Sequence, residues 1–217
     1  MPLHRRKFMQ AAAALSIALA AAPALAAPSA RQALAAVNGY LNGFRTLSGE
    51  FTQVSPRGRV STGKLYIARP GRMRFEYAPP NPYVIVSDGV WVAIRNNARD
   101  HVEYYPLSKT PLRIILARRV NLARDAIIRK VEVRDGLAVI TLKDRDKLVP
   151  GDLTLVYDLN ANRLQQWIVI DGQGRRTTVT LGRLRMNAKL SDKLFRVKKP
   201  GSGPTRRVRQ NFSSGKR

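Results

Sequence analysis

The 217-residue sequence contains no cysteine and only two histidines. Without cysteine there is no disulfide framework, no thiol chemistry and no lipidated N-terminal cysteine. His4 lies in the basic start of a predicted export leader, so a Ser-His-Asp site in the rest of the chain would depend on His101 alone, and no nucleophile-elbow motif accompanies it. We therefore interpret His101 as an exposed residue at the start of a strand and expect no catalytic residue.

Acidic residues are also scarce, with 14 Asp and Glu against 39 Lys and Arg. Asp144 and Asp146 alternate with Arg145 and Lys147, which indicates a solvated loop rather than a paired acid site. Three other aspartates directly precede a glycine, which is typical of turns; they are Asp88, Asp135 and Asp171. His/Cys clusters at metal-ligand spacing and glycine-rich phosphate loops are absent too, so we expect no metal, no cofactor and no enzymatic activity.

No stretch reaches the roughly 20 strongly apolar residues that a membrane-spanning helix needs. Residues 1–26 instead have the form of a signal peptide, with a basic start, an alanine-rich apolar run and the small-x-small cleavage site Ala24-Leu25-Ala26. The order Arg5-Arg6-Lys7-Phe8-Met9 also resembles a twin-arginine signal. An ordinary secretory leader and a twin-arginine leader both stay open, and either would place the mature protein outside the cytoplasm.

The charge is strongly one-sided, at a formal +25. Residues 198–217 carry seven cations and no acid, with Gly, Ser and Pro between them, and are typical of a disordered basic tail. For an exported protein this balance favours an anionic membrane surface, in transient contact with the tail, lipopolysaccharide or an acidic partner protein over nucleic acid. A merely solvated, arginine-rich surface is the other interpretation.

The mature chain opens with a helical pattern. Ser29 can cap a helix over residues 29–44, and Leu34, Val37, Tyr40, Leu41 and Phe44 recur at intervals of three and four residues. This amphipathic helix needs an apolar surface to cover.

After Leu47 the apolar period changes to two, which is the period of half-buried strands. Turn signals such as Asp88-Gly89 and Asp135-Gly136 separate the strands by hairpin-length connections. The pattern predicts about eleven strands, at 47–55, 60–68, 72–78, 83–87, 90–95, 100–105, 126–134, 137–143, 152–159, 163–170 and 175–184. An open flat sheet of that width would leave an uncovered apolar face, so we expect one strongly curved antiparallel sheet in a mainly β (α+β) domain over residues 27–197.

The stretch 64–95 carries the clearest apolar face. Alternating residues on successive strands are expected to share that face, and they are Leu65, Ile67, Met73, Phe75, Tyr77, Val84 and Val86. Phe51 is the central apolar residue of the first strand. Arg69 has the parity of Leu65 and Ile67, which places a guanidinium at the end of the apolar row.

A second helical pattern begins at Thr110, which can cap, with Pro111 in the first helical position. Its apolar stripe comprises Leu112, Ile114, Ile115 and Leu116. A short apolar helix between antiparallel strands is typical of a lid on a sheet rather than a crossover. A curled sheet with only two helices to fill it tends to leave a cavity for a ligand.

Five short motifs in register resemble the periplasmic outer-membrane lipoprotein carrier family, LolA, over roughly residues 29–201. They are Phe51-Thr52-Gln53, Arg69-Pro70-Gly71-Arg72-Met73-Arg74-Phe75-Glu76-Tyr77 with Pro80, Val86-Ser87-Asp88-Gly89 with Trp91, Thr110-Pro111-Leu112, and Asp171 with Gly174. The resemblance implies an unclosed β-barrel of eleven strands whose lid covers an apolar cavity for acyl chains. It also implies that Met73, Phe75 and Tyr77 line the cavity, that the segment after Thr110 is the lid, and that Arg69 hydrogen-bonds to the lid and acts in opening and closing.

The partners implied by the resemblance are acylated lipoproteins, an inner-membrane lipoprotein release complex and a receptor at the outer membrane, met by a periplasmic monomer. Two alternatives stay open. The chain could carry a different envelope lipid, or it could be a non-transporting sensor or scaffold for lipoproteins on the same fold.

Overall fold

The computed structural model describes residues 28–146 and 149–197. The predicted leader (1–26) and the predicted basic tail (198–217) lie outside the described residues. The domain between them is mainly β, as predicted, with one long helix and one large sheet.

Helix α1 (Ala30–Asn42) forms where the three- and four-residue spacing predicted it. Ser29 caps it by accepting a hydrogen bond from the Gln32 backbone N–H, while the Gln32 side chain accepts one from the Ser29 N–H. This reciprocal capping box satisfies two backbone donors that the first turn leaves free. The helix buries Ala33, Val37, Tyr40 and Leu41 against the sheet.

The sheet has eleven antiparallel strands, in agreement with the prediction, and each predicted strand boundary lies within two residues of the observed one. The strands are β1 Thr46–Val54, β2 Val60–Ala68, β3 Arg72–Tyr77, β4 Tyr83–Asp88, β5 Trp91–Asn96, β6 His101–Pro106, β7 Ala126–Arg134, β8 Leu137–Asp144, β9 Asp152–Asp158, β10 Arg163–Ile170 and β11 Arg176–Met186. Their spatial order is β6-β5-β4-β3-β2-β1-β11-β10-β9-β8-β7.

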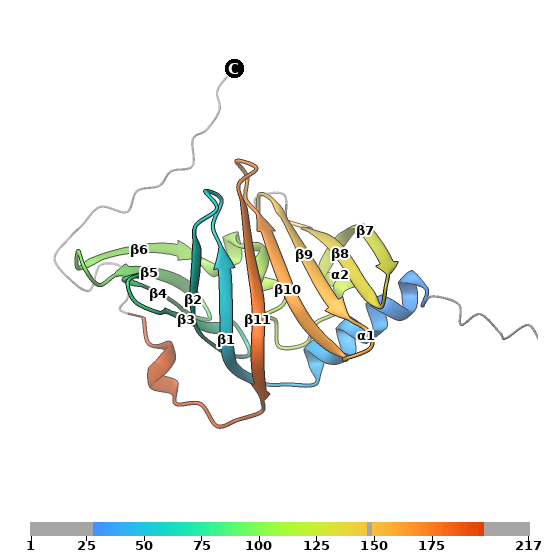
Figure 1. Cartoon of the computed structure of the whole chain (residues 1–217), viewed down its shortest axis with the longest axis horizontal. Helices are drawn as coiled ribbons and strands as arrows, with labels where there is room; N and C mark the ends of the chain where they lie inside the picture. The colour runs from blue at the N-terminus through green and yellow to red at the C-terminus, as the bar shows by residue number, and fades with distance from the viewer. Residues whose placement is uncertain (1–27, 147–148, 198–217) are drawn as a thin grey trace, which may run out of the picture.

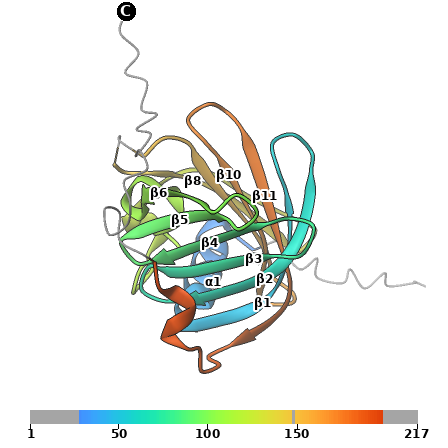
Figure 2. The same ribbon diagram turned by 90° about the vertical axis from the view of Figure 1, so that its left-hand side faces the viewer.

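The sheet curls into an open half-barrel with α1 on its concave side (Figures 1 and 2). Curvature is accompanied by a β-bulge between β1 and β11, where the register shifts between Gly49 and Phe51. A Cβ on Gly49 would lie 2.3 Å from the backbone oxygen of Arg183, so only glycine allows the two strands to approach this closely here.

The two outer strands of the sheet, β6 and β7, are consecutive in the sequence. The chain between them, residues 107–125, must therefore cross from one free edge of the half-barrel to the other. It contains the 3₁₀ turns η1 (Leu107–Lys109) and η2 (Pro111–Arg113) and the short helix α2 (Leu122–Asp125). Over the described part of the chain, no helix combines the length and apolar character needed to cross a membrane.

Candidate functional site

An aromatic cluster forms the floor of the concave face. The ring of Phe51 lies edge-on to Phe75 at 4.8 Å between centroids and to Tyr77 at 5.2 Å. Trp167, from the other half of the sheet, meets Phe75 at 6.1 Å. Edge-to-face geometry of this kind adds about 0.5–1.5 kcal/mol per pair beyond burial. The floor therefore joins both halves of the half-barrel.

Six of the eight residues predicted for the cavity face this concave side. Phe51, Leu65, Ile67, Met73 and Phe75 are buried in the main hydrophobic cluster, and Tyr77 packs against it partly exposed. The Tyr77 hydroxyl donates a 2.8 Å hydrogen bond to Oε1 of Gln53, and burial raises the pKa of Tyr77 to about 12.

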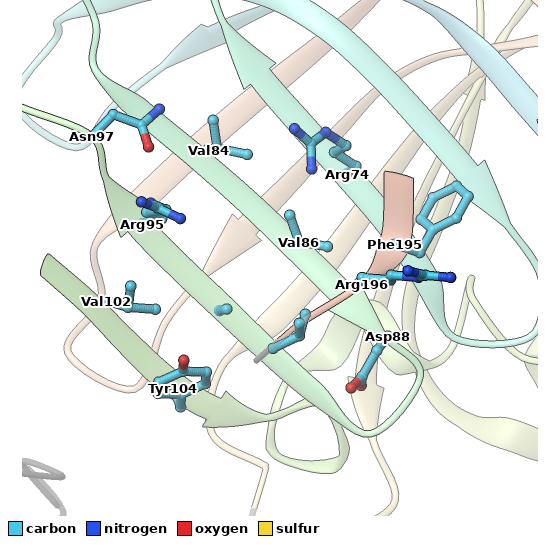
Figure 3. Close-up of a pocket in the computed structure, with 12 residues that line it drawn as sticks. Arg74, Val84, Val86, Asp88, Arg95, Asn97, Val102, Tyr104, Phe195 and Arg196 are labelled. Carbon is cyan, nitrogen blue, oxygen red and sulfur yellow. The ribbon is translucent and has the colours of Figure 1, made fainter. Parts of the chain in front are cut away.

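The placement predicted for Val84 and Val86 is wrong. The register pairs Phe75 with Ile85 and Arg74 with Val86, so Val84 and Val86 lie on the convex face while Ile85 lies on the concave one. Figure 3 shows both valines lining an outer groove. The cause is that β4 is apolar at consecutive positions, so its parity alone cannot tell the two faces apart.

A cleft of about 490 Å³ opens on the concave side next to Tyr77. Its inner wall includes Ile85, Gln53 and Thr177, and its rim comes from the β1–β2 and β10–β11 hairpins. Sequence reasoning missed Ile85 and Gln53. The sequence could have predicted Gln53, because it lies two residues after Phe51 on the same strand and therefore faces the same side of the sheet.

The segment predicted to form a lid is not an α-helix. Residues 111–113 form a single 3₁₀ turn, and Thr110 does not cap it, since its Oγ1 donates to the carbonyl of Leu107 at 3.0 Å. Ile114, Ile115 and Leu116 are all buried although they are consecutive. Three successive residues cannot share one stripe of a helix, so the segment is surrounded on several sides. Of the four predicted lid residues, Pro111, Ile114 and Ile115 are buried and Leu112 is partly buried.

We call residues 107–125 the lid. Hydrogen bonds hold it at Leu116 and Val120. The backbone N–H of Gly71, in the β2–β3 turn, donates to the carbonyl of Leu116 at 2.8 Å. Asn42 at the end of α1 bonds both backbone groups of Val120, at 2.8 Å and 2.9 Å. The lid is thus tied to α1 and to the turn that follows Arg69.

An ion pair whose acid is buried holds the lid at Arg113. Arg113 Nε donates to Oδ2 of Asp144 at 2.7 Å, and a second, short contact joins Arg113 Nη2 to Asp144 Oδ1. The Asp144 side chain is fully buried while that of Arg113 is 38% exposed. The hydrogen bond to Asp144 raises the pKa of Arg113. The expectation that Asp144 belongs to a solvated loop is therefore wrong; it ends β8 and anchors the lid.

Arg69 extends from the end of β2 into the interior, where it is 8% exposed. Its Nη2 donates to the backbone carbonyl of Phe44 at 2.5 Å, and its Cζ lies 4.2 Å from the Phe44 ring centroid. The predicted hydrogen bond from Arg69 to the lid is not the one observed. Arg69 bonds the chain just beyond α1, and Gly71 bonds the lid.

The guanidinium of Arg69 has no carboxylate partner among the residues that the structure describes. Its Nε and Nη1 atoms are buried without a hydrogen-bond acceptor. Burial lowers its pKa to about 10, so the group stays charged at neutral pH. A buried cation with two unused donors favours any rearrangement that supplies an acceptor or water.

Elsewhere, His101 is exposed and lies 3.4 Å from Glu103, as expected of a strand-start residue. No group of three or more metal-ligating side chains occurs among the residues that the structure describes.

Comparison with known proteins points to one family. The family model described as outer membrane lipoprotein carrier protein LolA matches residues 42–198. An outer-membrane lipoprotein carrier protein of Xylella fastidiosa is 26% identical over 182 residues, covering 79% of this chain and 86% of that protein. An uncharacterized protein of Rickettsia prowazekii, RP864, is 24% identical over 161 residues and 74% of each chain. The crystal structure of the LolA superfamily protein NE2245 from Nitrosomonas europaea is 12% identical, covers 79% of this chain and 99% of that chain, and superposes with a TM-score of 0.46.

Proposed function

Since the chain belongs to the outer membrane lipoprotein carrier protein LolA family, we propose that it binds the acyl chains of lipoproteins on the concave face of its half-barrel and carries them through the periplasm from the inner to the outer membrane. It acts as a carrier and chaperone, and catalyses no reaction. The apolar floor around Phe75 and Tyr77 receives the acyl chains, the lid covers them, and Arg69 acts in closing.

The observation that carries the proposal is that the lid side chains already occupy the concave face. Ile114, Ile115 and Leu116 pack in the same cluster as Phe51 and Phe75. Each acyl methylene removed from water contributes about 0.8 kcal/mol, so an empty open cavity would bind lipid too tightly to release it. An acyl chain must displace the lid side chains from the floor before it binds. The apolar contacts that the acyl chain gains replace those that the lid loses, so the net free energy of acyl binding is small.

Entry and release follow from where the lid is fastened. The cleft beside Tyr77 opens at the hairpin end of the concave face, away from the Asn42–Val120 attachment. An acyl chain entering beside Ile85 meets the aromatic floor first and then the lid side chains. Closing of the lid expels the chain at a receptor without a source of chemical energy.

The proposal includes the setting of the protein. Residues 1–26 are removed on export, residues 27–197 form the carrier domain, and residues 198–217 make transient contact with anionic membrane. The monomer receives acylated lipoproteins from an inner-membrane release complex and gives them to an outer-membrane receptor.

Locking the lid tests the proposal directly. Because the chain has no cysteine, Asn42→Cys and Val120→Cys can be joined uniquely by a short cross-linker that attaches through disulfide bonds and is released by reduction. The reduced variant is expected to extract a lipoprotein from inner-membrane vesicles and the cross-linked variant is not, with reduction restoring extraction. Mass spectrometry of protein purified from an envelope extract should find bound lipid or lipoprotein.

Equal extraction by the locked and reduced forms would overturn the lid mechanism. A wild-type protein that carries no lipid and extracts no lipoprotein would overturn the carrier function. A stable protein partner in cross-linked periplasm, without extraction, would instead favour a sensor or scaffold.

A further inference from the structure

Strand β4 is apolar on both faces. Ile85 faces the concave side, and Val84 and Val86 face the convex side. A strand with two apolar faces is typical of a sheet covered on both sides. Here the concave side is covered by the core, whereas the convex side of a half-barrel faces solvent.

The convex apolar surface extends over neighbouring strands. The register sets Val86 beside Ala93 and Ala93 beside Tyr104, and in the next row sets Val84 beside Arg95 and Arg95 beside Val102. Val84, Val102 and Tyr104 stay partly exposed. The row of Val86, Ala93 and Tyr104 is an apolar strip across β4, β5 and β6, and in the row beside it Arg95 lies between two valines.

The end of the described chain turns this strip into a groove. The turn η3 (Asp192–Phe195) lies on β3 and β4, fixed by an Arg72–Asp192 ion pair of 2.5 Å and by a 3.1 Å hydrogen bond from Arg74 Nη1 to the carbonyl of Leu194. Phe195 is buried there. The resulting groove has a volume of about 770 Å³ between η3 and β6 (Figure 3). A space of this size takes a short segment of chain rather than a folded domain.

The charges around the groove favour a negatively charged occupant. Arg74, Arg95 and Arg196 line it together with one acid, Asp88. Arg74 is held by Glu76 at 2.6 Å, whereas the Arg95–Asp100 pair, at 3.2 Å, is solvent-exposed and exchangeable. Arg196 forms no ion pair with any residue in the described ranges. The Asp88 carboxylate already accepts the backbone N–H groups of Val90 and Trp91.

We infer that this groove docks an extended segment of a partner protein that carries aliphatic side chains and carboxylates. The aliphatic side chains cover Val84, Val86 and Val102, and a carboxylate pairs with Arg196 and Arg95. A second copy of this chain fits poorly, because the formal charge of +25 falls only to +22 (25 − 3) when the three cations of the leader are removed, and two such molecules repel each other. The groove and the concave face lie on opposite sides of the sheet, so docking leaves lipid binding free.

The test uses a random octapeptide library displayed on phage and panned against the full protein. Enriched peptides should contain more Asp, Glu and aliphatic residues than the input library. Synthetic copies should bind Arg196→Glu about tenfold more weakly, as expected for a reversed charge at an interface rim, and Val102→Lys more weakly still. Arg183→Glu is the matched control, because Arg183 is likewise an exposed arginine without an ion pair among the described residues, and it lies outside the groove on β11.

Three results would overturn the inference: enrichment without acidic residues, binding that Val102→Lys leaves unchanged, or equal loss with Arg183→Glu. Sedimentation of the protein alone tests for a second copy in the groove, and sedimentation with phosphatidylglycerol vesicles tests for a membrane. If the wild type associates in either experiment and Val102→Lys does not, that second copy or membrane is the occupant and the inference is wrong. Lipoprotein extraction should be unchanged in all three variants, so failure of the carrier function and failure of this inference give different results.

Discussion

Arg69 and Phe44 are joined twice, by a 2.5 Å hydrogen bond from the guanidinium to the Phe44 carbonyl and by the stacking of Arg69 Cζ 4.2 Å from the Phe44 ring centroid. The pair connects the end of α1 to the turn that holds the lid through Gly71. Among the described residues the Arg69 side chain donates to Phe44 alone, because its Nε and Nη1 atoms have no acceptor there.

Arg69→Leu should therefore make the protein retain lipid. The variant loses the bond to Phe44 and adds an apolar side chain to the concave side, so the closed, empty form loses stability relative to the loaded form. We expect transfer of a fluorescent lipopeptide to acceptor vesicles to slow about tenfold, the effect of one hydrogen bond to a charged group. Arg72→Leu, which changes the neighbouring arginine on the convex face, should transfer at the wild-type rate. Unchanged transfer by Arg69→Leu would remove the gating role.

Ile85 and Val84 are adjacent on β4 and lie on opposite faces of the sheet, so substitutions at the two positions test the two faces separately. Ile85→Glu places a carboxylate in the cleft beside Tyr77 and should reduce loading of a fluorescent fatty-acyl probe by about tenfold or more, because an acyl chain lying over this partly exposed position would remove the charge from water. Val84→Glu, on the convex face, should load normally. Thermal melting of both variants checks that they are folded. Similar losses in the two variants would contradict the assignment of the cleft as the entrance.

The Arg113–Asp144 pair should contribute measurably to stability. Arg113→Ala leaves the Asp144 carboxylate fully buried without its partner. Removing one member of a buried pair costs about 3–5 kcal/mol, and because Arg113 is partly exposed we expect about 2 kcal/mol in the free energy of unfolding measured in urea. Arg95→Ala breaks the exposed pair with Asp100 and should change that free energy by less than about 1 kcal/mol. Adding Asp144→Asn to Arg113→Ala should recover part of the loss; no recovery would mean that the carboxylate is not the cause.

Alkaline pH should weaken the fold through Tyr77. Burial raises the pKa of Tyr77 from its ordinary value of 10.0 to about 12 in the folded protein. Between those two values the folded protein keeps a proton that the unfolded chain has lost, so its stability falls as pH rises through this window. The loss in Tm from pH 10 to pH 12 should be smaller in Tyr77→Phe than in the wild type. An equal loss would show that other tyrosines, such as Tyr105, dominate the alkaline transition.

Regular alternation made the sheet predictable. Met73, Phe75 and Tyr77 on β3 alternate with charged residues, so one face could only be the buried one, and the turn signals set the strand ends within two residues. Strand β4 lacks that contrast. Its inward face is set by pairing with β3 across the proline-rich connection, which is a long-range property.

The lid is a second region whose structure could be predicted from the sequence only in part. Its apolar residues and its place between the sheet edges could be predicted, but its shape could not, because Ile114, Ile115 and Leu116 are consecutive and all buried in the core cluster, which one helical stripe does not allow. Asp144 was hidden by neighbouring charges in the sequence. Its partner, Arg113, lies 31 positions away, and only the fold brings the two together.

The order of the strands has a consequence for how the protein acquires its structure. Every ladder except one joins strands that are neighbours in the chain, and the exception pairs β1 with β11, from Leu47–Met186 to Val54–Thr178. Residues 46–106 and 126–186 can therefore form two meanders by local hairpin closure, which is fast. Joining them requires closing a loop that spans almost the entire domain, and its entropy must be lost before the contacts form. The seam between the first and last strands is thus the late step of folding, and the concave face exists only once the final strand of the chain has docked.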